Sequence, residues 1–125
     1  MKAGSDEVSF LGPVYGQREI AALRCFARLY IHGHSAGGTN PALVEAMGAG
    51  LPVLAHGNRF NRWVAGSGAR YFLSGGECMR ELEALLDDPA QLAAMRDASR
   101  RRFLENFTWP QVLAAYERLL ERWQS

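Results

Sequence analysis

A glycine-rich segment between residues 34 and 56 holds the groups best suited to binding a ligand. It reads HSAGGTNPALVEAMGAGLPVLAH, with Gly37, Gly38, Thr39 and Asn40 immediately before a helix-forming run. Backbone amides at the start of a helix attract phosphate, and glycines allow a ligand to approach the backbone closely. The order fits neither GxGxxG nor GxxxxGK[ST]. The segment therefore predicts an anion-binding loop, with a purely structural turn as the alternative.

Glu45 is the one charged residue of the run that follows this loop. It lies one turn into the predicted helix, where side chains lean back toward the N-terminus. A carboxylate repels a phosphate, whereas sugar hydroxyls donate hydrogen bonds to it. We therefore expect a nucleotide diphosphate whose ribose is bound by Glu45; the alternative is a solvated helix residue.

Histidines and arginines flank the same segment. His34 is a candidate hydrogen-bond partner for the ligand. Arg59 and Arg62 follow the run PVLA and are candidates for contact with the diphosphate, although one of them could form a structural salt bridge instead. His32, His34 and His56 have no carboxylate or cysteine at ligand spacing beside them, so we expect no metal site.

Short apolar runs alternate along the chain with segments in which apolar residues recur at helical spacing. These elements must position the candidate ligand-binding side chains. The runs at residues 8–11, 29–32, 52–55 and 69–73 predict strands, and the periods at 17–27 and 42–49 predict helices. Asn40 and Pro41 are a favourable helix start. After residue 73 the periodicity is wholly helical. The pattern predicts an α/β fold: a Rossmann-like, doubly wound parallel sheet of about four strands followed by C-terminal helices, with ligands at the carboxyl ends of the strands.

The composition is that of one globular domain. The chain has 125 residues, of which 48% are hydrophobic and 22% charged. A formal net charge of +1 provides no general attraction to nucleic acid, so no nucleic-acid partner is expected. Cys25 and Cys78 lie far apart and predict buried thiols of a cytoplasmic protein.

A run of three arginines, Arg100 to Arg102, follows Arg96 by one helical turn. Such a run is usually a solvated helix face. Peripheral contact with the inner face of the membrane is the alternative, although adjacent side chains point in different directions around a helix.

The segment GGTNPALVEAMGAGLPVLAHGNRFNR resembles the nucleotide-sugar-binding part of GT-B glycosyltransferases of family 4. GGTNP with FNR downstream is especially similar to their rhamnosyltransferase-like branch. The resemblance implies a C-terminal donor-nucleotide-binding domain over residues 8–125, after a disordered or cloning-derived lead at residues 1–7. It implies transfer of a sugar, rhamnose or another hexose, from a nucleotide-diphosphate sugar to a glycan or lipid-linked acceptor in bacterial polysaccharide biosynthesis.

Residue by residue, the resemblance makes Glu45 the carboxylate that binds the ribose. Gly38, Thr39 and Asn40 would supply amides to the diphosphate or donor sugar, with no cofactor or metal needed. Gly37 stands eight positions before Glu45, where the family often has a first Glu, and Trp63 stands where the related branch tends to have an acidic residue.

The resembled enzymes have an acceptor-binding domain and basic residues upstream of this region. We therefore expect the chain to be part of a longer enzyme, incomplete at its N-terminal side and inactive alone, and we assign no catalytic residue. The alternative is a non-catalytic Rossmann-like nucleotide-binding or interaction domain. Gly37 in place of an acidic residue favours that alternative, whereas Glu45 and the intact Gly-Thr-Asn-Pro favour the enzyme.

Overall fold

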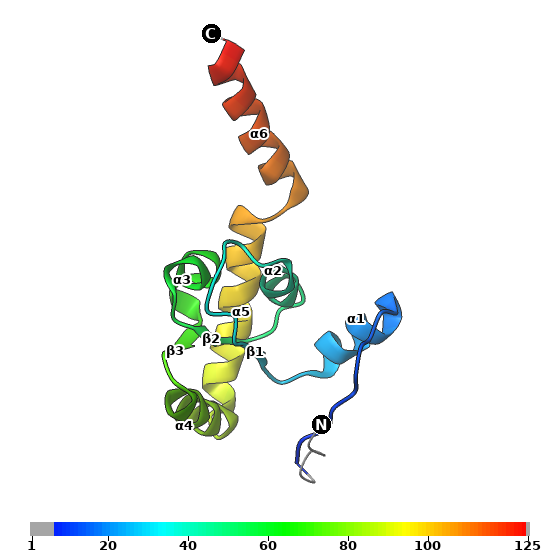
Figure 1. The fold of residues 1–125 in the computed structure, drawn as a ribbon, viewed down its shortest axis with the longest axis vertical. Coiled ribbons are helices and arrows are strands. Elements are labelled where there is room, and N and C mark those ends of the chain that lie inside the picture. The colour runs from blue at the N-terminus through cyan, green and yellow to red at the C-terminus, as the bar shows by residue number, and fades with distance from the viewer. Residues whose placement is uncertain (1–6, 125) are drawn as a thin grey trace.

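The computed structural model of the protein describes residues 7–124, so most of the expected lead at residues 1–7 lies outside the described residues. A small parallel sheet stands at its centre with helices around it (Figure 1). The elements in chain order are α1 (Gln17–Phe26), β1 (Tyr30–His32), α2 (Pro41–Gly48), β2 (Val53–His56), α3 (Arg59–Ala65), the 3-10 turn η1 (Gly66–Gly68), β3 (Arg70–Phe72), α4 (Gly75–Leu86), α5 (Pro89–Asn106) and α6 (Trp109–Gln124).

The three strands form one sheet in the order β1-β2-β3, and both pairs are parallel. Tyr30 lies opposite Val53, and Leu54 lies opposite Arg70. A helix connects each strand to the next, as parallel pairing requires. The predicted α/β class and the parallel sheet are confirmed.

The strand expected at residues 8–11 is not formed, so the sheet has three strands where about four were expected. The side chains of Val8, Phe10 and Leu11 are 51%, 66% and 67% exposed. A strand is stable only when its amides and carbonyls pair with a neighbour, and no strand within residues 7–124 pairs with this segment. The apolar run alone was therefore a poor guide at this position.

The central strand β2 is covered on both faces. Val53 and Ala55 belong to a buried cluster with Leu43 and Met47 of α2 and with residues of α3. Leu54 points the other way and joins a cluster with side chains of β3, α4 and α5. Because successive residues of a strand alternate between faces, a continuously apolar strand is buried on both sides.

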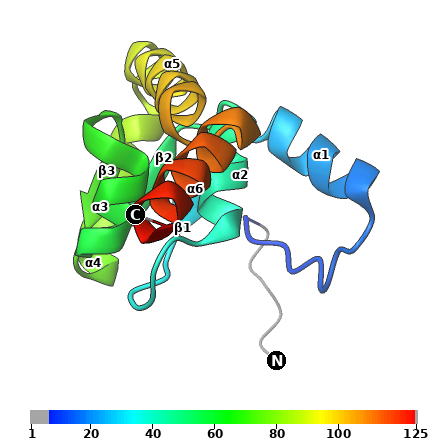
Figure 2. The same cartoon turned by 90° about the horizontal axis from the view of Figure 1, so that it is seen from above.

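The first and last helices lie outside this core. Neither α1 nor α6 has a buried residue, and both project from the body of the protein (Figures 1 and 2). Phe26 on α1 is 85% exposed and Trp123 on α6 is 83% exposed. These two helices therefore leave most of their large apolar side chains exposed.

Part of the arginine run is used inside the fold. Arg102 donates to the carbonyl oxygens of Trp63 and Val64 at the end of α3, the second at 3.2 Å. Arg96 donates to the carbonyl oxygen of Ala27 just after α1, also at 3.2 Å. These two side chains satisfy backbone acceptors at helix ends. In the part of the chain that the structure describes, no helix is long and apolar enough to cross a membrane.

Candidate functional site

The glycine-rich loop connects β1 to α2 at the carboxyl edge of the sheet, and Figure 2 shows it in cyan, projecting from the body. Its residues from 33 to 39 are exposed. Gly37 has φ of +93°, a backbone conformation that favours glycine. Gly38 has no such requirement, and a Cβ on either glycine would meet no atom within 4 Å. The turn thus explains why residue 37 is a glycine. The turn does not require a glycine at position 38, which borders open space.

Asn40 begins α2 in the predicted way. Its Oδ1 accepts a hydrogen bond from the amide of Ala42 at 2.9 Å, and Pro41 occupies the first helical position. The Asn40 carbonyl oxygen accepts from the amides of Leu43 at 3.1 Å and Val44 at 3.3 Å. The amides of the first turn are therefore already bonded to Asn40.

The amides left for a ligand are those of the loop itself. Within residues 7–124, the amides of Gly38, Thr39 and Asn40 donate no hydrogen bond. They lie next to the positive end of the α2 dipole, which is where an anion is stabilised. The amides that stay free to bind an anion are thus those of the loop rather than those of the first helical turn.

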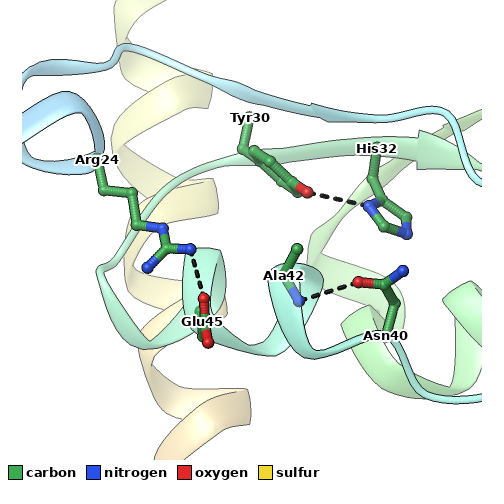
Figure 3. Close-up of polar contacts among 6 residues, drawn as sticks. All are labelled: Arg24, Tyr30, His32, Asn40, Ala42 and Glu45. Carbon is green, nitrogen blue, oxygen red and sulfur yellow. Dashed lines mark hydrogen bonds and ion pairs between the residues drawn. The ribbon is translucent and has the colours of Figure 1, made fainter. Parts of the chain in front are cut away.

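Glu45 lies one turn further along α2 and forms an ion pair with Arg24 of α1 (Figure 3). The Arg24 Nη2 donates to the Glu45 Oε2, and the two side chains are 29% and 54% exposed. Tyr30 lies near both. Burial raises the pKa of the Tyr30 phenol, while Arg24 lowers it and Glu45 raises it. Sequence reasoning missed Arg24; its only signal was a cation in the last turn of an otherwise apolar helix face.

His32 ends β1 and is buried, with 4% of its surface exposed. Its Nδ1 lies 3.1 Å from the Tyr30 hydroxyl, and its ring stacks on His34 with centroids 5.7 Å apart. Burial lowers the pKa of His32, and His34 lowers it further. In the tautomer in which the Tyr30 O–H donates to Nδ1, the neutral imidazole carries its proton on Nε2.

That Nε2 has no hydrogen-bond partner among the described residues, and Figure 3 shows the His32 ring directed toward Asn40 at the start of α2. The buried Nδ1 of His56, at the end of β2, likewise lacks a partner within residues 7–124. In the same part of the chain, no group of three or more histidine, cysteine or acidic side chains could hold a metal ion.

Two asparagines hold the main chain at His34. The His34 carbonyl oxygen accepts from Nδ2 of Asn61 at 2.9 Å and from Nδ2 of Asn58 at 3.1 Å. Asn61 also donates to the carbonyl oxygen of His56 at 3.0 Å and is 3% exposed. The buried amide of the FNR segment therefore fixes the ends of β1 and β2 relative to each other. Sequence reasoning missed this role, and it also missed the helix α3 that carries Asn61.

The two predicted arginines have different surroundings. Arg62 donates from Nε to the Gly57 carbonyl oxygen at 2.9 Å, and its guanidinium lies 4.5 Å from the centre of the Tyr71 ring. Arg59 is exposed and stacks on the ring of Phe60 at 4.7 Å. Both side chains are exposed: Arg62 contacts the Gly57 carbonyl oxygen and the Tyr71 ring at the sheet edge, and Arg59 contacts the ring of Phe60.

A groove of about 660 Å³ lies beside the loop. Thr39, Pro41 and Glu45 form one side of it, and Phe103 and Trp109 belong to the other. The site therefore combines loop amides, a carboxylate with its arginine partner, and an adjoining apolar groove.

Comparison with known proteins identifies one family. The model of the glycosyl transferase-like family matches residues 2–118. No curated protein and no solved structure matches the chain significantly.

Proposed function

The chain belongs to the glycosyl transferase-like family, and we propose that it forms the donor-binding part of an enzyme that transfers a sugar from a nucleotide-diphosphate sugar. The acceptor in this proposal is a glycan or a lipid-linked glycan. The observation that carries the proposal is that the loop amides before α2 are unbonded and that the Glu45 side chain lines the same groove as Thr39 of that loop. Family membership supports glycosyl transfer in general.

In the proposed binding mode, the diphosphate accepts hydrogen bonds from the amides of Gly38, Thr39 and Asn40. Glu45 accepts hydrogen bonds from the ribose hydroxyls. Negative charge develops on the diphosphate as the sugar leaves, and fixed amides directed at it stabilise that charge without reorganising. Arg59 and His34 are further donors to the diphosphate or the sugar, and no metal is needed. Arg62 acts on this site through the packing of β3.

We further assign the chain to the GT-B enzymes of family 4 and to their rhamnosyltransferase-like branch. The support is the pair of segments GGTNP and FNR, together with the hydrogen bond from Asn61 of FNR to the carbonyl oxygen of His34 before GGTNP. The donor sugar in this assignment is rhamnose or another hexose.

The experiment is titration of the chain with UDP, GDP, ADP and dTDP by calorimetry, followed by variants of Glu45. Charge-assisted hydrogen bonds contribute about 1.5–3 kcal/mol each, so Glu45→Ala should weaken binding by roughly tenfold to a hundredfold. Glu45→Gln keeps the shape without the charge and should have a smaller effect. Glu83→Gln removes a charge from an exposed site on α4 and should change nothing.

Thermal melting separates binding from folding. Glu45 is exposed and its ion pair contributes at most about 1 kcal/mol, so both variants should melt close to the wild type. Unchanged affinity with a large fall in melting temperature would show that Glu45 is structural. Nucleotide binding without transfer by the full-length enzyme would favour a non-catalytic nucleotide-binding domain.

A further inference from the structure

We propose that Arg24 of α1 is a positioning residue that orients the Glu45 carboxylate toward the ribose hydroxyls of the donor, an inference that rests on the proposed function. Arg24 lies 21 positions before Glu45, and their side chains meet across the gap between α1 and α2 (Figure 3).

The geometry of the pair leaves Glu45 able to bind a ligand. Arg24 uses Nη2 to bond one carboxylate oxygen, Oε2. A carboxylate has two oxygens and about four lone-pair sites, so Oε1 and part of Oε2 stay available to two hydroxyls. The guanidinium holds one rotamer of Glu45 in place before the ligand arrives. A long side chain that is already fixed loses less freedom on binding.

The pair has little to do with holding the fold together. Both side chains are partly exposed, and exposed ion pairs contribute little to stability. The helix that carries Arg24 has no buried residue. A contact that joins a peripheral helix to the proposed ribose-binding carboxylate, and adds little to the core, is better explained by the ligand than by packing.

The charge of Arg24 has a second consequence for binding of the donor. A bare carboxylate one turn from a bound diphosphate would repel it. The guanidinium offsets that repulsion, so one carboxylate can accept hydroxyl hydrogen bonds beside a phosphate-binding loop. The phenol of Tyr30 lies near both charges, and burial raises its pKa further above neutral pH, so it adds no charge to the pair.

The test compares ribonucleoside with 2′-deoxyribonucleoside diphosphates. UDP, GDP and ADP and their 2′-deoxy forms are titrated into wild type, Arg24→Gln, Glu45→Gln and the double variant. Wild type should prefer the ribose form. Arg24→Gln should weaken binding of the ribose form by about two- to tenfold, the cost of immobilising one side chain. It should also bring the ratio of ribose to deoxyribose affinity closer to one. The double variant should bind as Glu45→Gln does.

Arg18→Gln is the matched control because Arg18 is an exposed arginine on the same helix. It should leave affinity and selectivity unchanged. Three results would overturn the role of Arg24 and leave the proposed function standing. Arg24→Gln could bind like wild type, or it could lose equal affinity for the ribose and deoxyribose forms. Its effect could also add to that of Glu45→Gln in the double variant. If wild type binds none of the diphosphates, the proposed function and the role of Arg24 both fail.

Discussion

Replacing Asn61 should loosen the candidate site and destabilise the protein together. Its Nδ2 donates to the carbonyl oxygens of His34 and His56, at 2.9 and 3.0 Å, and the residue is 3% exposed. Each hydrogen bond contributes about 0.5–1.5 kcal/mol, so Asn61→Ala should lower the free energy of unfolding by roughly 1–3 kcal/mol. In a domain of this size, each kcal/mol corresponds to roughly 3–6 °C in melting temperature.

Asn61→Asp is the sharper variant. It keeps the size of the side chain but puts a carboxylate oxygen in the place of Nδ2, where it faces the carbonyl oxygens of His34 and His56 and receives no hydrogen bond from either. A buried charge without a partner costs about 3 kcal/mol or more, so this nearly isosteric change should destabilise more than alanine does.

The measurement is urea unfolding followed by circular dichroism, with thermal melting alongside. Asn106→Ala is the control, because Asn106 is exposed and makes one hydrogen bond, from Nδ2 to the Arg102 carbonyl oxygen at 3.2 Å. Its effect should stay within about 0.5 kcal/mol. The reasoning is refuted if Asn61→Ala is equally mild, or if Asn61→Asp is no worse than Asn61→Ala.

Three further changes test the loop, the core and a buried phenol. Gly37→Ala should lower the free energy of unfolding by roughly 1–2 kcal/mol, because φ of Gly37 is +93°. Gly38→Ala should change the same free energy by less than about 0.5 kcal/mol, and urea unfolding of both variants makes the comparison. Leu54→Ala should lower it by about 2–5 kcal/mol, since the side chain is 0% exposed; an effect below 1 kcal/mol in the same assay contradicts this packing. Burial raises the pKa of Tyr71 to about 12 although Arg62 and Arg102 lower it. The folded state therefore keeps a proton that the unfolded state loses near pH 10, so stability should fall from pH 10 to pH 12, and less so in Tyr71→Phe. Ultraviolet titration should show one phenol ionising near pH 12 that is missing from Tyr71→Phe.

The sequence by itself determined the features that depend on neighbouring residues. Asn40 and Pro41 predict the start of α2 because capping involves a side chain and amides within a few positions. The apolar runs at β1, β2 and β3 predict strands, and the helix predicted between β1 and β2 favours a parallel pair. The helix α3, between β2 and β3, was not predicted. The glycine-rich loop is at the carboxyl edge of the sheet because it follows β1 directly.

Only the tertiary structure decided the features that depend on distant partners. The run at residues 8–11 has the composition of a strand, yet no strand in the described part of the chain pairs with it. Glu45 is visible in the sequence, but its pairing with Arg24 depends on where α1 comes to lie. Asn61 resembles any other polar helix residue until the fold places the His34 carbonyl oxygen 2.9 Å from its amide. Hydrogen bonds and ion pairs act over a few ångströms in space, and separation along the chain does not reveal which groups come that close.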